Sequence, residues 1–195
     1  RLVDSVVSNN TARRTTNAPV GRGGGISVFG GTVEGCRIEG NYAQWQGGGI
    51  YMGDVLDGLG NVVAESVDGL VRNCVLTNNV CGNNNANPGT ASTLNGGGAF
   101  LSAGLMDSCT VVGNKNMHYM EGLDHHMRGQ GAVYVSGTAE LRNSLVAGNL
   151  CDMGAQGILV EGANAKVVNC PVAGNGQAGY DYKQTAYESV IKSGL

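Results

Sequence analysis

The sequence contains few charged and few aromatic residues. Asp, Glu, Lys and Arg make up only 14% of the 195 residues, and there are two Phe and one Trp. Helices of a globular domain usually carry many Lys and Glu on their exposed faces, so this composition argues against a helix-rich domain. The net charge of −3 gives no basic stripe along the chain. We therefore expect no nucleic-acid partner, because such binding relies on clustered positive charge.

Long apolar runs are also missing. A bilayer-spanning helix needs about 18 or more consecutive apolar residues, and no such run occurs, so we expect no transmembrane segment. The N-terminus lacks the charged, apolar and small-residue regions of a signal peptide, and Arg1-Leu2-Val3 already has the pattern of a repeat. We therefore expect the chain to be part of a longer polypeptide.

A short motif is present in six copies. It consists of Cys or Ser, an apolar residue two positions later, and Asn five positions after the Cys/Ser slot. The spacing between successive Asn residues ranges from 26 to 38, which indicates repeats with insertions confined to certain loops. The slot is occupied by Ser5, Cys36, Cys74, Cys109, Ser144 and Cys170. The motif asparagines are Asn10, Asn41, Asn79, Asn114, Asn149 and Asn175.

Six cysteines raise the possibility of a disulfide framework. Four of them share the repeat slot, which is a packing pattern rather than a crosslinking one. The other two, Cys81 and Cys151, each follow a motif Asn by two residues but lie two repeats apart. We expect most or all of the six to be unpaired, because free Cys behaves as a small buried apolar side chain.

Further columns align with the motif and predict the fold. Apolar residues recur three positions before the slot and two positions after it; the odd offset implies a kink or bulge just before the slot, because even offsets along a strand share one face. Each repeat then continues into glycines and another strand, such as Gly47 to Met52. Strands of this kind bury their apolar residues only by stacking. We predict an all-β parallel β-helix over residues 1–176, with about six rungs that rise about 4.8 Å each.

Two polar columns support this register. The motif asparagines are expected to lie one above another and to bond each other through their amides. Two residues before the slot, Glu34, Arg72, Asp107 and Arg142 alternate in sign, which suits neighbouring parallel strands; chance alternation is the other interpretation. Each carboxylate would face an arginine, which lowers its pKa and disfavours a general acid.

These repeats resemble the right-handed parallel β-helix repeats of bacterial surface and secreted proteins, in particular polymorphic outer-membrane and autotransporter-adhesin passenger domains. The shared elements are Ile38-x-x-Asn41 and the following Gly48-Gly49-Ile50-Tyr51. The resemblance covers about residues 2–175. It implies an extracellular or cell-surface module used for attachment to a polysaccharide or cell-surface glycan, and it carries over no catalytic residues.

The segment 177–195 breaks the repeat pattern. Ala186, Val190 and Leu195 would form one face of a short helix after Thr185. Such a helix would cap the open end of the coil, where strand edges are unpaired. A linker that starts at Gln177 is the alternative.

Insertions fall mainly between the motif Asn and the glycines, at 11–22, 80–95 and 115–128. Stacking would project these loops from one side of the coil, around the short turn that holds Trp45. The first insertion carries Arg13 and Arg14, which would neutralise an acidic sugar or remain hydrated.

The aromatic residues Tyr51, Phe100 and Tyr134 are predicted to point outward from the glycine strands, and we call them the ring column. The ring column and Trp45 would stack on sugar rings. The alternative is that the insertion 54–69 covers the column, giving a satellite apolar cluster.

Two insertions contain possible metal ligands. Two His and a carboxylate can bind zinc, but adjacent His side chains usually point apart, so a solvated loop is the alternative. Acidic residues in the insertion 54–69 would bind calcium, or the segment would form a hairpin with Gly-containing turns. We expect no other cofactor. The zinc candidates are His118, Asp124, His125 and His126, and the calcium candidates are Asp54, Asp57, Glu65 and Asp68.

Polysaccharide lyases, epimerases and hydrolases also use this fold, and they need paired carboxylates or a neutralised uronate with a basic proton acceptor on adjacent rungs. The outward position after the slot contains no such row. We therefore predict a non-catalytic extracellular module that presents loops and an aromatic face to a carbohydrate or surface. The alternatives are a polysaccharide-active enzyme that uses the loop 118–128 with Arg13 or Arg14, and a structural spacer.

Overall fold

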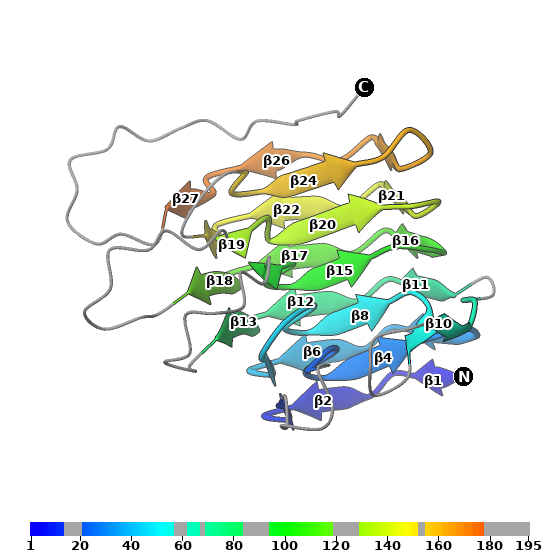
Figure 1. The fold of residues 1–195 in the computed structure, drawn as a ribbon. Coiled ribbons are helices and arrows are strands. Elements are labelled where there is room, and N and C mark those ends of the chain that lie inside the picture. The colour runs from blue at the N-terminus through cyan, green and yellow to red at the C-terminus, as the bar shows by residue number, and fades with distance from the viewer. Residues whose placement is uncertain are drawn as a thin grey trace.

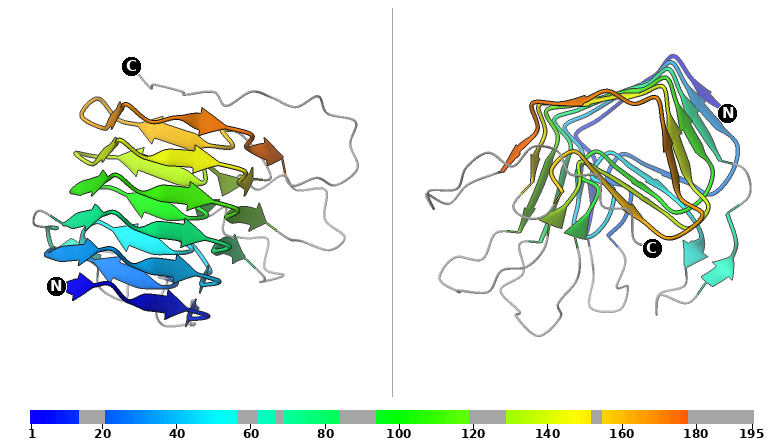
Figure 2. Two further views of the ribbon diagram at one scale, coloured as in Figure 1. Left: turned by 180° about the vertical axis from the view of Figure 1, so that it is seen from behind. Right: turned by 90° about the horizontal axis from the view of Figure 1, so that it is seen from above.

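The computed structural model describes residues 1–13, 21–56, 62–66, 69–83, 94–118, 129–151 and 155–177. Every regular element within these ranges is a β-strand. The strands form stacked parallel sheets, three of six strands and one of five, that surround a common core (Figure 1). Viewed along the stack, successive turns of the chain superimpose (Figure 2). The predicted all-β parallel β-helix is therefore confirmed.

Each of the first five turns of the coil contributes one strand to each sheet, and the sixth contributes strands to sheets 1 to 3. We number the sheets in chain order. Sheet 1 contains β1 (Leu2–Val3), β5 (Thr32–Glu34), β11 (Leu70–Arg72), β16 (Leu105–Asp107), β21 (Glu140–Arg142) and β25 (Lys166–Val168). Sheet 2 contains β2 (Val6–Ser8), β6 (Arg37–Glu39), β12 (Val75–Thr77), β17 (Thr110–Val112), β22 (Leu145–Ala147) and β26 (Val172–Ala173).

The second half of each turn forms the other two sheets. Sheet 3 contains β3 (Thr11–Ala12), β7 (Tyr42–Ala43), β13 (Val80–Asn83), β18 (Lys115–His118), β23 (Leu150–Cys151) and β27 (Gly176–Gln177). Sheet 4 contains β4 (Ile26–Val28), β8 (Ile50–Met52), β15 (Ala99–Leu101), β20 (Val133–Ser136) and β24 (Ile158–Glu161). A short parallel pair, β14 (Leu94–Asn95) and β19 (Gly129–Gln130), connects sheet 3 to sheet 4 in two of the turns.

The register of sheets 1 and 2 matches the apolar columns predicted from the repeat. Val71 pairs with Val33 on one side and with Met106 on the other. Leu76 pairs in the same way with Ile38 and Val111, and all three of these side chains are fully buried. Equivalent residues of successive repeats therefore contact one another inside the coil, and their burial provides the main stabilisation.

The kink predicted before the slot is a left-handed backbone residue. Asn73, Ser108 and Asn143 have φ angles of 53°, 52° and 50°, and Gly35 has 62°. Glycine adopts this conformation without strain, and Asn adopts it more readily than most residues. This corner turns the chain from sheet 1 into sheet 2, which explains the odd spacing between the apolar column and the slot.

Sheet 3 was not predicted from the sequence. The segments 11–12, 80–83 and 115–118 were assigned to loops, but they form strands in register with one another. The assignment was wrong because these strands have only two to four residues and their inward column lacks large apolar side chains. The signal was the small or polar residue that lies two positions after each motif Asn. This inward column is Ala12, Ala43, Cys81, Asn116 and Cys151, and the backbone of Gln177 pairs at the next position.

The insertion after β8 contains an antiparallel pair, β9 (Val55–Leu56) and β10 (Val62–Ala64). The predicted hairpin is therefore confirmed, although its turn at 57–61 lies outside the described residues. The predicted cap or linker begins at Gln177, the last described residue, and the helix expected around Ala186 and Val190 also lies outside them. Within the described part of the chain, no helix is long and apolar enough to cross a membrane.

Candidate functional site

The motif asparagines form a continuous ladder inside the coil. The Oδ1 atom of Asn79 accepts hydrogen bonds from the backbone amide of Asn41 at 3.1 Å and from its side-chain amide at 3.0 Å. Asn79 in turn donates to Asn114 in the same way and to the carbonyl of Ile38 at 2.9 Å. Asn41, Asn79, Asn114 and Asn149 are fully buried. The predicted ladder is confirmed, and it satisfies buried polar groups rather than forming a reactive site.

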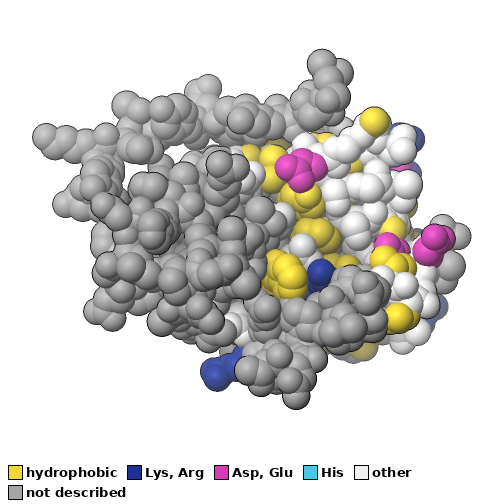
Figure 3. Space-filling view, viewed as in Figure 1, with side chains coloured by type: hydrophobic (Ala, Val, Ile, Leu, Met, Phe, Trp, Pro, Cys, Tyr) yellow, Lys and Arg dark blue, Asp and Glu magenta, His cyan; other side chains and the backbone are white. Residues whose placement is uncertain are grey.

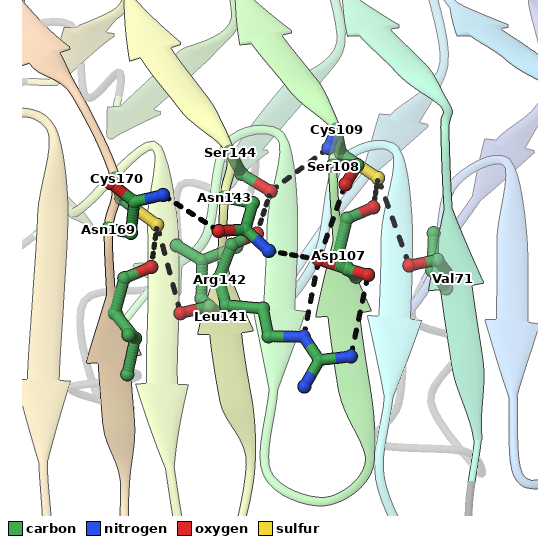
Figure 4. Close-up of polar contacts among 11 residues, drawn as sticks. Val71, Asp107, Ser108, Cys109, Leu141, Arg142, Asn143, Ser144, Asn169 and Cys170 are labelled. Carbon is green, nitrogen blue, oxygen red and sulfur yellow. Dashed lines mark hydrogen bonds and ion pairs between the residues drawn. The ribbon is translucent and has the colours of Figure 1, made fainter.

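A second ladder occupies the Cys/Ser slot at the corner between sheets 1 and 2. The Sγ atom of Cys109 donates to the carbonyl of Asp107 at 3.2 Å, and the backbone amide of Cys109 donates to Ser144 Oγ at 3.0 Å (Figure 4). The backbone amide of Cys74 donates to Cys109 Sγ at 3.4 Å. All six cysteines are free, as predicted. Cys and Ser are interchangeable here because each supplies one small donor that also accepts.

The alternating charges of sheet 1 form ion pairs between rungs. Arg72 lies 2.9 Å from Glu34, and Arg142 lies 3.2 Å from Asp107. Hydrogen bonds from Arg1 and Arg72 lower the pKa of Glu34. A hydrogen bond from Asn143, with a further contribution from Arg142, lowers the pKa of Asp107. Both carboxylates are therefore held ionised at neutral pH, which is the opposite of what a general acid requires.

The inward column of sheet 3 donates hydrogen bonds to backbone carbonyls of the segments that lead into sheet 4. Cys81 Sγ donates to the carbonyl of Trp45 at 2.9 Å, and Cys151 Sγ donates to the carbonyl of Gln156 at 3.2 Å. Between them, Asn116 Nδ2 donates to the carbonyl of Gln130 at 2.9 Å. Cys81 and Cys151 are thus separated by a rung, as predicted. Burial raises the pKa of Cys81, so this thiol is not reactive at neutral pH.

The ring column is a closed stack. The ring centroids of Tyr51 and Phe100 are 5.4 Å apart with planes 12° from parallel, and those of Phe100 and Tyr134 are 4.7 Å apart at 11°. The three residues are 4%, 7% and 8% exposed, and they form a cluster separate from the main core. The burial of the rings favours the satellite cluster over an exposed sugar-binding platform, because the rings cover much of each other's faces. Figure 3 shows a band of hydrophobic side chains on this side of the stack.

Arg22, which the sequence did not single out, lies at the end of the ring stack. Its guanidinium carbon is 5.2 Å from the ring centroid of Trp45 and 5.2 Å from that of Tyr51. Arg22 and Trp45 meet because a parallel bridge pairs Arg22 with Gln46. Both side chains are only partly buried. A possible signal was the position of Arg22 directly before the first glycine run, at the level of the Trp45 turn.

The other predicted site residues are only partly described. Arg13 is exposed at the end of β3, close enough to influence the pKa of Tyr42. The backbone of His118 ends β18, but its side chain is not described, and Arg14, Asp124, His125 and His126 lie outside the described residues. Asp54 Oδ1 accepts the backbone amide of Ser66 at 2.8 Å. Among the residues that the structure describes, no group of three potential ligands is placed to hold a metal.

These features define the protein as a parallel β-helix with buried asparagine and cysteine/serine ladders and a partly exposed arginine–tryptophan pair. Comparison with known proteins gives no match to a family model and no significant match to a curated protein or to a solved structure. The resemblance to bacterial adhesin passenger domains therefore stays a hypothesis based on the sequence motifs.

Proposed function

We propose that this protein is a non-catalytic binding module, which presents the segments at one corner of the coil to a carbohydrate outside the cell. The observation that carries the proposal is the position of the ends of these segments. Residues 84–93 connect β13 to β14, and residues 119–128 connect β18 to β19. Because β13 pairs with β18, the two segments begin at aligned positions of sheet 3. Because β14 pairs with β19, they also end at aligned positions.

The segment 14–20 belongs to the same set. It follows β3, which aligns with β13 through β7, and it returns at Arg22, which aligns with Asn95 through Gln46. The short turn around Trp45 lies between these rungs. Binding residues are commonly found on loops that a rigid scaffold positions. The scaffold therefore aligns the ends of three insertions at one corner of the coil.

The coil holds the ends of these segments firmly. The backbone of the Trp45 turn is fixed by hydrogen bonds from its amide to Gly21 at 2.9 Å and from Cys81 to its carbonyl. Asn116 fixes the return of the next long segment through Gln130. Backbone that is already fixed loses little conformational entropy when a ligand binds, so the anchoring lowers the entropic cost of binding.

The non-catalytic assignment is supported by the electrostatics of the described carboxylates on sheet 1. Glu34 and Asp107 are paired with arginines and have lowered pKa values. A glycosidase needs one carboxyl group with a raised pKa as its general acid. The bacterial cell-surface location is proposed from the sequence resemblance alone.

The proposal is tested by binding the purified protein to a panel of immobilised acidic and neutral polysaccharides, while the supernatant is analysed for released oligosaccharides. We expect retention without product release. Replacement of residues 84–93 by a short Gly-Ser linker should weaken retention. The matched control replaces the exposed Val75 and Leu145 of sheet 2 by Ser and should bind as the wild type does.

Two results would contradict the proposal. Absence of binding to every polysaccharide would exclude the carbohydrate function. Release of oligosaccharides, abolished by His125→Ala or His126→Ala, would instead establish the polysaccharide-active enzyme.

A further inference from the structure

The outward column of sheet 4 contains rings at three adjacent levels and a serine at the next. Ser27 pairs with Tyr51, which pairs with Phe100, which pairs with Tyr134. Phe100 is covered on both faces by neighbouring rings, but Tyr51 has a ring on one side only, because Ser27 provides none. The guanidinium of Arg22 lies against Tyr51 instead, 5.2 Å from its centroid. Phe29 contacts Tyr51 edge-on, with centroids 6.3 Å apart.

Among the residues that the structure describes, no carboxylate balances the positive charge of Arg22. Arg1, Arg37, Arg72 and Arg142 each form an ion pair with a Glu or Asp, whereas no described acidic residue pairs with Arg22. The Nε atom of Arg22 is buried and has no hydrogen-bond partner within the described ranges. Burial lowers the pKa of Arg22, and the interactions that oppose this effect come from Tyr51.

Tyr51 does not supply a negative charge at neutral pH, because burial raises its pKa. A partly buried guanidinium without a counter-ion is unfavourable compared with one in water. An anionic group that reached Arg22 would therefore supply the charge partner that the described residues do not provide. The planar guanidinium of an arginine also fits a carboxylate better than the compact ammonium of a lysine does, because it can donate two parallel hydrogen bonds.

The indole of Trp45 supplies the second part of a sugar site. Its centroid lies 5.2 Å from the guanidinium carbon, and the residue is partly exposed at the corner where the insertions begin. Aromatic rings offer a flat, rigid contact area at a small entropic cost. The apolar face of a pyranose would lie on the indole while a carboxylate on the same sugar reaches Arg22.

We propose that Arg22 and Trp45 form a binding site for a uronic-acid residue of an acidic polysaccharide. This inference rests on the proposed carbohydrate-binding function and names its ligand class. The competing explanation is that Arg22 only closes the ring stack, as a cation over Tyr51. The two explanations differ in whether Arg22 affects the affinity for a carboxylated ligand specifically.

The test measures the affinity of the full chain for oligogalacturonate and for its methyl-esterified form by calorimetry. Arg22→Gln should lower the affinity for oligogalacturonate at least about tenfold, the effect of losing a charged hydrogen bond. It should leave the affinity for the methyl ester unchanged. Trp45→Ala should lower the affinity for both ligands. Arg22→Lys, which keeps the charge but not the planar group, should show an intermediate loss for oligogalacturonate.

Arg37→Gln is the matched control, because it removes the same charge from an exposed arginine of sheet 2 that pairs with Glu39. It should leave both affinities unchanged. Circular dichroism and thermal unfolding verify that each variant is folded.

Each failure has a distinct outcome. Binding of neutral glycans without binding of oligogalacturonate would overturn the uronate site and leave the carbohydrate function standing. An equal loss of affinity in Arg22→Gln and Arg37→Gln would show that the effect arises from net charge alone. Unchanged binding by a folded Arg22→Gln variant would show that Arg22 only closes the stack. Binding to no polysaccharide would remove the proposed function as well.

Discussion

The side-chain oxygen of Asn114 accepts two hydrogen bonds from Asn79, one from the backbone amide at 3.0 Å and one from the side-chain amide at 2.9 Å. Asn114 then donates in the same way to Asn149, at 2.8 Å and 3.0 Å. One buried asparagine thus satisfies the backbone of the rung before it and depends on the rung after it. The ladder couples the rungs at a corner where an apolar residue would leave amide groups unpaired.

Asn79→Ala should strongly destabilise the coil. The substitution removes the acceptor for two donors of Asn41 and a donor to Asn114. Because each buried group left unpaired costs about 1 to 3 kcal/mol, we expect the free energy of unfolding to fall by about 3 kcal/mol or more. Urea denaturation followed by circular dichroism measures this change. The control is Asn10→Ala at the exposed end of the ladder, and an equal effect of both would contradict the prediction.

Gly48→Ala should be more harmful than Gly148→Ala. A Cβ atom at Gly48 would lie 2.2 Å from the carbonyl oxygen of Gly97 and 2.5 Å from the backbone of Val80, so rungs would have to separate. Gly148 has a φ of 61° with nothing within 4 Å of the added atom, and only backbone strain of about 1 kcal/mol is expected. Thermal unfolding compares the two, and a larger loss for Gly148→Ala would refute the close-approach argument.

Acid should weaken the charged column of sheet 1. The pKa values of Glu34 and Asp107 are lower in the folded state than their ordinary values near 4. Their contribution is therefore fully present above about pH 5 and is lost as the pH falls through the folded-state pKa. We expect the free energy of unfolding to decrease from about pH 5 to pH 2, less steeply in Asp107→Asn. High salt should reduce the difference between the variants, because both carboxylates are partly exposed.

Cys170 should be the first thiol to react in the native protein. It is only partly buried, whereas the other five cysteines are buried. Burial also raises the pKa of Cys170, so alkylation by iodoacetamide should be slow at neutral pH and faster at alkaline pH. Mass spectrometry identifies the modified residue, and Cys170→Ser should remove the fast phase. Early modification of Cys81 would show that the corner of sheet 3 opens more readily than its hydrogen bonds indicate.

Phe100→Ala should destabilise the satellite cluster. Phe100 is 7% exposed and stacks between Tyr51 and Tyr134. Removal of a buried Phe side chain costs about 3 to 5 kcal/mol, part of which comes from the lost ring contacts. Phe29→Ala is the control, since Phe29 is 38% exposed and should lose much less. Denaturant unfolding of both variants checks the prediction, which fails if the two losses are equal.

The apolar columns and the polar ladders could be predicted from the sequence because a coil places equivalent residues in direct contact. Val33, Val71 and Met106 recur at the same offset from the slot and lie in register in sheet 1. The repeated Asn follows the same logic, since the amide of one rung is the partner of the next. Sheet 3 could not be predicted in this way, because its inward residues, such as Ala43 and Asn116, share no chemical type.

The candidate site could be predicted only in part. Trp45 and the outward direction of Tyr51 follow from the repeat, but the contact between Trp45 and Arg22 does not, because it depends on the bridge between Arg22 and Gln46. The burial of Phe100 was also beyond the local pattern. The alternation of side chains along a strand predicts which face of the sheet a ring occupies. The exposure of the ring depends on the rings in the rungs above and below.

The amino-acid sequence by itself determined the stacking of this protein, since a side chain repeated at a constant offset can be buried and hydrogen-bonded only by its own copies. The tertiary structure decided which surface residues meet across the corner, where insertions of different length return to the coil. Arg22 came to lie over Tyr51 and beside Trp45 because Ser27 left the last position of the ring stack without a ring. That arrangement depends on two adjacent rungs at once, and no single repeat contains it.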